Sequence, residues 1–194
     1  MDKNIQFQKF ALTRIDRAKM KNQKPMCLWL TGLSGSGKTT IANALEMELY
    51  KMKKHTYILD GDNLRHGLSS DLNFSTESRN ENIRRVAEIA KIIVDSGLVV
   101  IVALISPYKI QRDWARSIFM PKEFKEIYIS TSLNECEKRD LKGLYKMARR
   151  GEIKDFTGIT SPYEVPKNPD LTIDTQNTTI DECVQQVLKQ VEIS

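Results

Sequence analysis

A glycine-rich segment, residues 32–39, contains the residues whose types and spacing point most directly to chemistry. It reads GLSGSGKT and satisfies the phosphate-binding pattern G-x-x-x-x-G-K-[ST]. Its glycines let successive backbone N–H groups turn toward one polyphosphate, which predicts a nucleotide site of the P-loop kind. We expect Lys38 to reach the β- and γ-phosphates of ATP and Thr39 to ligate Mg²⁺. The alternative is a glycine-rich turn that merely joins a strand to a helix.

Two carboxylates follow the strand-like run 57–59, in the sequence Asp60-Gly61-Asp62-Asn63. Ligands bind at the edge of a parallel sheet where its strands end. A phosphotransferase needs a group there that orients, and accepts the proton of, the attacking hydroxyl. We expect Asp62 to face the site as this group and Asp60 to serve the metal, together with Thr39, or to support the site. The alternative is a solvated turn.

Four arginines and two phenylalanines are candidates for binding an anionic, base-containing acceptor. Arg65, Arg79, Arg84 and Arg85 cluster after the second strand, where guanidinium groups could clamp an anion, although some will only lie on the surface. Phe74 and Phe156 stand in polar, loop-like sequence, so they could stack on a base, and each could equally belong to the core. His66 has no ligand partner at useful spacing and is given no role.

A basic segment predicts a lid over the phosphates. It contains Arg139, Lys142, Lys146, Arg149 and Arg150 and continues into a glycine-containing stretch, 142–160, and a proline-rich stretch, 161–169. Such a lid neutralises phosphate charge and excludes water. A solvated helix face is the alternative for any single member. We assign the following residues to nucleotide binding: Gly32, Ser34, Gly35, Ser36, Gly37, Lys38, Thr39, Thr40 and Arg139.

The elements that must position these residues alternate between strand and helix, which predicts an α/β fold. We expect a P-loop NTPase-type parallel sheet flanked by helices, with the basic lid above it. The segment 98–105, unbroken in its apolarity, is expected to be the central strand. The predicted strands are 26–31, 57–59, 98–105, 126–130 and 171–173. One predicted helix directly follows the P-loop. The other predicted helices cover residues 81–95, 110–119, a segment from 133 onward, and 180–191.

Length and composition favour a single domain. The chain has 194 residues, a net charge of +5 and three cysteines in no metal-binding pattern. We expect a basic arm over residues 1–24, a domain over 25–194, a cytoplasmic location, and neither a nucleic-acid nor a membrane partner. A nucleic-acid-binding P-loop module finds no reading motif in support. A regulatory domain without turnover is disfavoured by the intact Lys38, Thr39 and Asp62.

A set of blocks spread along the chain resembles the adenylyl-sulfate kinase family. The resemblance runs from about Thr13 to the C-terminus, in order and without large gaps. Several of these blocks are rare outside the family. They are residues 32–40, 60–63, 65, 74–79, 81–85, 105–107, 136–137, 139–140, 142–145, 148–149, 151–153, 156–159, 163–164 and 166.

The resemblance implies that adenosine 5′-phosphosulfate (APS) is phosphorylated by ATP at its ribose 3′-hydroxyl. By matching positions it implies an APS site in which Phe74 and Phe156 sandwich the adenine. It also implies a homodimer, and leaves open an association with ATP sulfurylase and a related acceptor other than APS. Ser78 departs from the family, which usually has an acid there. We expect this to loosen acceptor positioning or adjust acceptor specificity, and to leave the reaction type unchanged. The implied APS residues are Asp62, Asn63, Arg65, Phe74, Arg79, Asn82, Ile105, Ser106, Lys142 and Phe156.

Ser106 occupies a family position traditionally described as a phosphorylated intermediate, and we expect the opposite. A serine hydroxyl needs a neighbouring base to become a nucleophile, and the sequence supplies no histidine near it. Direct in-line transfer needs only positioning and charge stabilisation. We expect Ser106 to contact APS through its hydroxyl or backbone. Among the site residues, Lys38, Asp62 and Ser106 are therefore assigned to the catalytic centre, with Ser106 as a contact.

Overall fold

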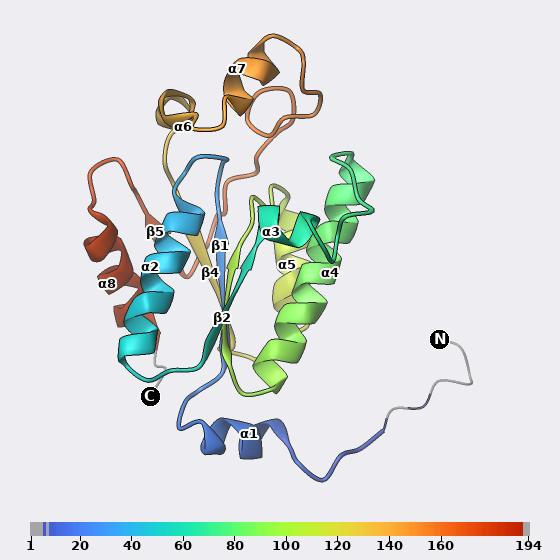
Figure 1. Cartoon of the computed structure of the whole chain (residues 1–194), viewed down its shortest axis with the longest axis vertical. Coiled ribbons are helices and arrows are strands. Elements are labelled where there is room, and N and C mark those ends of the chain that lie inside the picture. Colours follow the sequence, from blue (N-terminus) through green and yellow to red (C-terminus); the bar gives the residue numbers. More distant parts are fainter. Residues whose placement is uncertain (1–5, 7, 192–194) are drawn as a thin grey trace.

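A five-stranded sheet forms the centre of the molecule, and its strands are paired in parallel in the order β2-β3-β1-β4-β5 (Figure 1). The computed structural model describes residues 6 and 8–191. Because the strands are parallel, their carboxyl ends meet at one edge, where the glycine-rich loop also lies. The strands are β1 (Met26–Thr31), β2 (Thr56–Asp60), β3 (Val99–Ala103), β4 (Phe124–Ile129) and β5 (Leu171–Ile173).

The central strand is β1, and the expectation that residues 98–105 form it was wrong. β3 lies between β1 and β2 in the sheet. All residues of both β1 and β3 are buried, because each has neighbouring strands on both sides and helices on both faces. An unbroken run of apolar residues therefore indicates an interior strand, but it does not show which of two interior strands is the central one.

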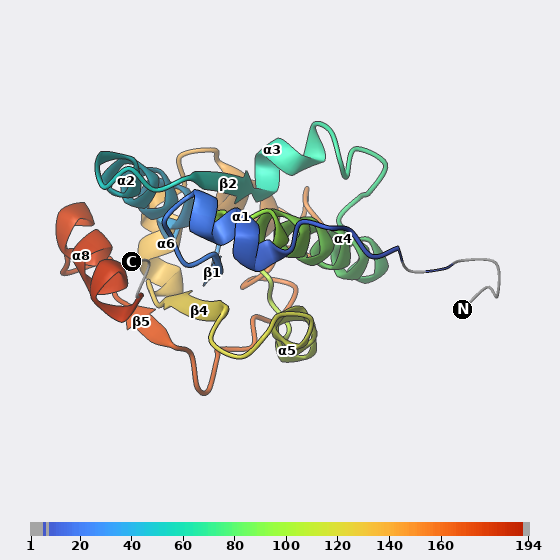
Figure 2. The same cartoon turned by 90° about the horizontal axis from the view of Figure 1, so that it is seen from below.

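Two helical layers bury the two faces of the sheet (Figure 2). The helices α2 (Lys38–Lys51) and α8 (Ile180–Gln190) pack on one face through residues such as Leu45 and Val187. The helices α4 (Thr76–Asp95) and α5 (Lys109–Ser117) pack on the other through residues such as Val86 and Ala115. Two apolar layers of this kind, separated by the sheet, confirm the predicted α/β fold.

Three short helices surround the carboxyl edge of the sheet. α3 (Gly61–Arg65) directly follows β2, whereas α6 (Leu133–Arg139) and α7 (Leu144–Arg149) belong to the segment above that edge (Figure 1). We call residues 142–160 the lid and residues 161–169 the strap. α3 was not predicted, because its first residues were interpreted as a loop. Its N-cap is Asp60, whose side chain accepts hydrogen bonds from the backbone of Asp62 and Asn63.

A further helix, α1 (Arg14–Met20), lies in the segment predicted to be a basic arm. Thr13 and Asp16 form a capping box at its start. Gln23, which is 6% exposed, donates to the carbonyls of His55 and Gly97 and so fixes this segment to the amino edge of the sheet. The part of the arm over residues 1–5 and 7 lies outside the described residues.

Within the described range, no helix combines the length and apolarity that crossing a membrane requires.

Candidate active site

The glycine-rich loop turns from the end of β1 into the start of α2, as the predicted P-loop requires. Gly35 and Gly37 have φ angles of +72° and +102°, a region that favours glycine. A Cβ atom on Gly32 would lie 2.6 Å from the carbonyl oxygen of Ile129. The loop therefore lies so close to β4 that a side chain at position 32 would clash with it. Its backbone can bind an anion at the helix N-terminus.

Lys38 lies under this loop and is only 8% exposed. Its Nζ donates to the carbonyl oxygens of Gly32 and Leu33, at 2.9 and 2.6 Å. Burial lowers the pKa of Lys38 to about 8, an effect partly opposed by acidic groups nearby, including Asp60. The ammonium is thus close to the loop that would hold a triphosphate, and its charge is sensitive to mildly alkaline pH.

Thr39 and Asp60 bring two oxygen donors together beside the P-loop. The hydroxyl of Thr39 donates to Oδ2 of Asp60 at 2.8 Å, while Oδ1 of Asp60 accepts from the backbone of Asp62 at 3.0 Å. Hydroxyl and carboxylate oxygens are the hard ligands that Mg²⁺ prefers. The described residues contain no group of three or more His, Cys, Asp or Glu side chains arranged for a metal. The pair therefore fits a phosphate-bound Mg²⁺ rather than a cage made of protein ligands alone.

Asp62 lies in the first turn of α3, and its carboxylate forms an ion pair with the ammonium of Lys142 from the lid. Both side chains remain largely exposed, at 70% and 64%. The hydrogen bond to Asp62 raises the pKa of Lys142. The acidic segment is therefore a capped helix start in which Asp60 is buried and Asp62 is exposed and paired with the lid.

The four arginines of the predicted cluster separate into two pairs. The guanidinium of Arg65 lies 4.3 Å from the ring centre of Phe74, and Arg79 donates to Thr157 of the lid at 2.6 Å. Arg84 and Arg85 instead pair with Glu81, and Arg85 also pairs with Asp71. These last two arginines stabilise the surface of α4, so only Arg65 and Arg79 remain candidates for binding an acceptor.

The two candidate stacking residues have different surroundings. Phe74 is 59% exposed and has Arg65 against its ring. Phe156 is partly buried and packs edge-on against Tyr145, with ring centres 5.0 Å apart. The hydroxyl of Tyr145 in turn donates to the carbonyl of Ser34 at 2.9 Å. Phe156 is thus connected to the P-loop through one tyrosine of the lid, which the sequence analysis did not single out.

Asn82 and Gln111 are buried amide side chains on the facing helices α4 and α5. Asn82 is 5% and Gln111 7% exposed, and neither side-chain oxygen has a hydrogen-bond partner within the described residues. A buried acceptor without a partner costs about 1–3 kcal/mol. Asn82 therefore has a free acceptor for a ligand within the described residues, and the family resemblance implies a place for it in the APS site.

Ser106 follows β3 in a backbone conformation with φ +40° and is 2% exposed. Its Oγ accepts a hydrogen bond from the indole Nε1 of Trp29 and donates to Oγ1 of Thr31, both at 3.0 Å. The hydroxyl therefore points into the protein, toward β1, and not toward a substrate. Ser106 was expected to contact APS through its hydroxyl or its backbone, and only a backbone contact fits this geometry.

The basic residues of the lid segment divide in the same way. Arg139 donates to the hydroxyl and carbonyl of Thr175, at 2.9 and 3.0 Å, and lies against Gly37. Arg149 and Arg150 pair at 2.6 Å with Glu137 and Glu152, which belong to the same part of the chain. Arg139 thus lies beside the P-loop, whereas Arg149 and Arg150 match the alternative of a solvated face.

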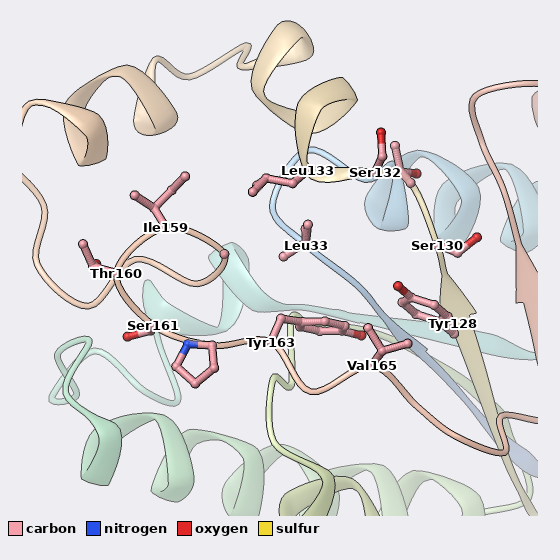
Figure 3. A pocket seen from close by; sticks show the side chains of 13 residues that line it. Leu33, Tyr128, Ser130, Ser132, Leu133, Ile159, Thr160, Ser161, Tyr163 and Val165 are labelled. Atoms are coloured by element: carbon pink, nitrogen blue, oxygen red, sulfur yellow. The ribbon is translucent and has the colours of Figure 1, made fainter.

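A cavity of about 580 Å³ lies between the P-loop, the end of β4 and the strap (Figure 3). Its lining includes Leu33, Tyr128, Leu133, Ile159, Tyr163 and Val165. The rings of Tyr128 and Tyr163 are stacked, with centres 6.0 Å apart. None of the residues assigned to the site from the sequence lines this cavity. The cavity borders the P-loop at Leu33, and the acidic residues 60 and 62 are not part of its lining.

Comparisons with known proteins place this geometry in context. The family model described as Adenylylsulphate kinase matches residues 24–174. An adenylyl-sulfate kinase of Marinobacter nauticus is 53% identical over 97% of this chain and 95% of its own length. A probable adenylyl-sulfate kinase of Halalkalibacterium halodurans is 58% identical, over 91% of this chain and 85% of its own. The Mycobacterium tuberculosis APS kinase, solved with AMPPNP and APS, superposes with a TM-score of 0.84 at 46% identity, covering 87% of this chain and 98% of that one.

Proposed function

The chain belongs to the adenylylsulphate kinase family, and from this membership we propose which residues carry its reaction. The reaction is the ATP-dependent phosphorylation of APS at the ribose 3′-hydroxyl, which gives 3′-phosphoadenosine 5′-phosphosulfate and ADP, a step of sulfate activation. The observation that carries the assignment of roles is that the P-loop, the Thr39–Asp60 pair and the Asp62–Lys142 pair share one edge of the sheet.

The nucleotide is held on one side of this edge. The P-loop backbone and the N-terminus of α2 bind the phosphates, and Arg139 borders them from α6. Lys38 stabilises the charge that develops on the transferred phosphoryl group. Thr39 and Asp60 would hold Mg²⁺, which would neutralise charge on the bound phosphates. The remaining P-loop residues, Ser34, Ser36 and Thr40, contribute backbone and hydroxyl groups to the same site.

The acceptor is held on the other side, between α3, α4 and the lid. Phe74 and Phe156 stack on the adenine, while Arg65 and Arg79 bind the phosphosulfate as planar, permanently charged groups. Asn82 supplies an acceptor that has no partner among the described residues, and Asn63 and the backbone of Ile105 and Ser106 complete the site. Lys142, which pairs with Asp62, brings the lid to the ribose.

Asp62 is the general base of this proposal. Its carboxylate orients the 3′-hydroxyl and accepts the proton as the oxygen attacks the γ-phosphorus of ATP, and ADP leaves on the opposite side. Lys142 of the lid forms an ion pair with this carboxylate. No covalent enzyme intermediate is needed, because the displacement takes place in one step.

A coupled assay of ADP release with APS as the only acceptor tests this function. We expect ADP release to depend on APS, and other nucleotides or sugars to compete poorly. Release with a different nucleotide-like acceptor in preference to APS would favour the alternative left open by Ser78. A dimeric assembly, an association with ATP sulfurylase and a cytoplasmic location remain proposals that sedimentation, co-purification and fractionation can test.

A further inference from the structure

Arg112, on α5, connects three separate segments near the acceptor side. It is 2% exposed, and its guanidinium makes three hydrogen bonds of 2.7 Å. Nε donates to Glu126 of β4, Nη1 to the carbonyl of Ser106, and Nη2 to the carbonyl of Glu164 in the strap. One buried side chain therefore joins the sheet, the turn after β3 and the strap.

A second connection joins the same turn to the same strap. The hydroxyl of Tyr163 lies 2.9 Å from Oγ1 of Thr31, which itself donates to the carbonyl of Ile105 at 2.7 Å. The ring of Tyr163 stacks on Tyr128, as Figure 3 shows. The turn and the strap are thus fixed to each other at two neighbouring points.

The two segments adjoin different parts of the proposed acceptor site. The strap continues directly from the part of the lid that contains Phe156, and the turn contains Ile105 and Ser106. The backbone of Ser106 has φ +40°, a conformation that persists in a non-glycine residue only where its surroundings hold it. Arg112 supplies one of these constraints through the Ser106 carbonyl.

We propose that Arg112 is a positioning residue for APS binding. Without touching the substrate, Arg112 holds the Ile105–Ser106 turn and the strap in fixed positions relative to each other. The proposal rests on the proposed function, since it takes these segments to bind APS. Arginine suits the role because its planar group reaches three acceptors at once. Lysine at this position keeps the charge for Glu126 but reaches fewer partners.

The test compares Arg112→Lys with Arg116→Lys in steady-state kinetics of the full chain. Arg116 lies one turn further along α5 and pairs with Asp170 at 2.6 Å and with Glu126 at 3.6 Å, so it is a matched control. We expect Arg112→Lys to raise KM for APS by about tenfold to a hundredfold. KM for ATP in this variant, and both constants in Arg116→Lys, should stay within about twofold of the parent.

Equal increases in both Michaelis constants, or equal effects of the two substitutions, would overturn the proposal. If Arg112→Lys fails to fold, Tyr163→Phe carries the test, because it removes one hydroxyl and keeps the ring on Tyr128. This variant should raise KM for APS and leave KM for ATP unchanged, and an unchanged KM for APS would refute the role. A parent enzyme that releases no ADP with APS would instead refute the proposed function.

Discussion

The carboxylate of Asp62 and the ammonium of Lys142 form an ion pair at the carboxyl edge of the sheet, although 80 residues separate them in the chain. The pair joins the start of α3 to the lid. Because both groups are well exposed, it contributes less than about 1 kcal/mol to stability. The ion pair therefore matters for where it places the two groups: it brings the lid next to the proposed base, Asp62.

Lys142→Met should raise KM for APS about tenfold, because the lid then loses its contact beside the ribose, while ATP binding stays unchanged. The melting temperature should not move, since the pair is exposed. Lys154→Met, another exposed lysine of the lid, is the control. A loss of affinity for ATP as large as that for APS would show that Lys142 serves the nucleotide instead.

Asp62→Asn should lower kcat by roughly 10²–10⁴-fold, because an amide keeps the shape of the side chain but accepts no proton. The dissociation constant for ATP, measured by calorimetry, should be unchanged. Asp71→Asn removes a carboxylate that pairs with Arg85 on the surface and should leave kcat alone. Near-parental turnover in Asp62→Asn would exclude Asp62 as the base.

The pH profile of kcat/KM for ATP should fall on the alkaline side, with a midpoint near the lowered pKa of Lys38, about 8. The sign follows from the chemistry: Lys38 is a cation below its pKa and neutral above it, and only the cation stabilises phosphate. Lys38→Ala should reduce turnover by roughly 10²–10³-fold and abolish this alkaline fall. An unchanged alkaline fall in that variant would assign the titration to another group.

Phe74→Ala and Phe156→Ala should each raise KM for APS, since loss of base stacking costs about 1–3 kcal/mol. Phe156→Ala should also lower the melting temperature, because Phe156 packs on Tyr145. Phe74→Ala should leave the melting temperature unchanged, because Phe74 is exposed. Tyr50→Ala, at an aromatic residue that is 78% exposed on α2, provides the control. Equal increases in KM for ATP would indicate a packing defect.

Local patterns in the sequence were sufficient for the P-loop and the parallel sheet. The motif is contiguous, and the strand and helix around it have clear apolar periods. The order of the interior strands could not be predicted, because β1 and β3 are equally buried. Asp60 was interpreted as a metal or support residue, and its role as the N-cap of α3 was missed.

The orientation of side chains depends on contacts between distant segments, which no local pattern records. Ser106 was expected to contact APS through its hydroxyl or its backbone, and the hydroxyl instead accepts a hydrogen bond from Trp29 on β1. Arg112 and Tyr145 were not singled out, since their partners lie in other segments. The capping box at Thr13 and Asp16 was a local signal that could have predicted α1.

The central claim is direct transfer of the phosphoryl group from ATP to APS, and rapid-quench analysis of labelled phosphate tests it most directly. Enzyme with γ-labelled ATP is mixed with APS, quenched during the first turnover, and the label is located. The buried hydroxyl of Ser106 forms hydrogen bonds with Trp29 and Thr31, and none with a general base is found in the described part of the chain. We therefore predict that the label appears only in ATP and on the 3′-oxygen of the product. Label on Ser106 that forms and decays at the rate of turnover would contradict this account.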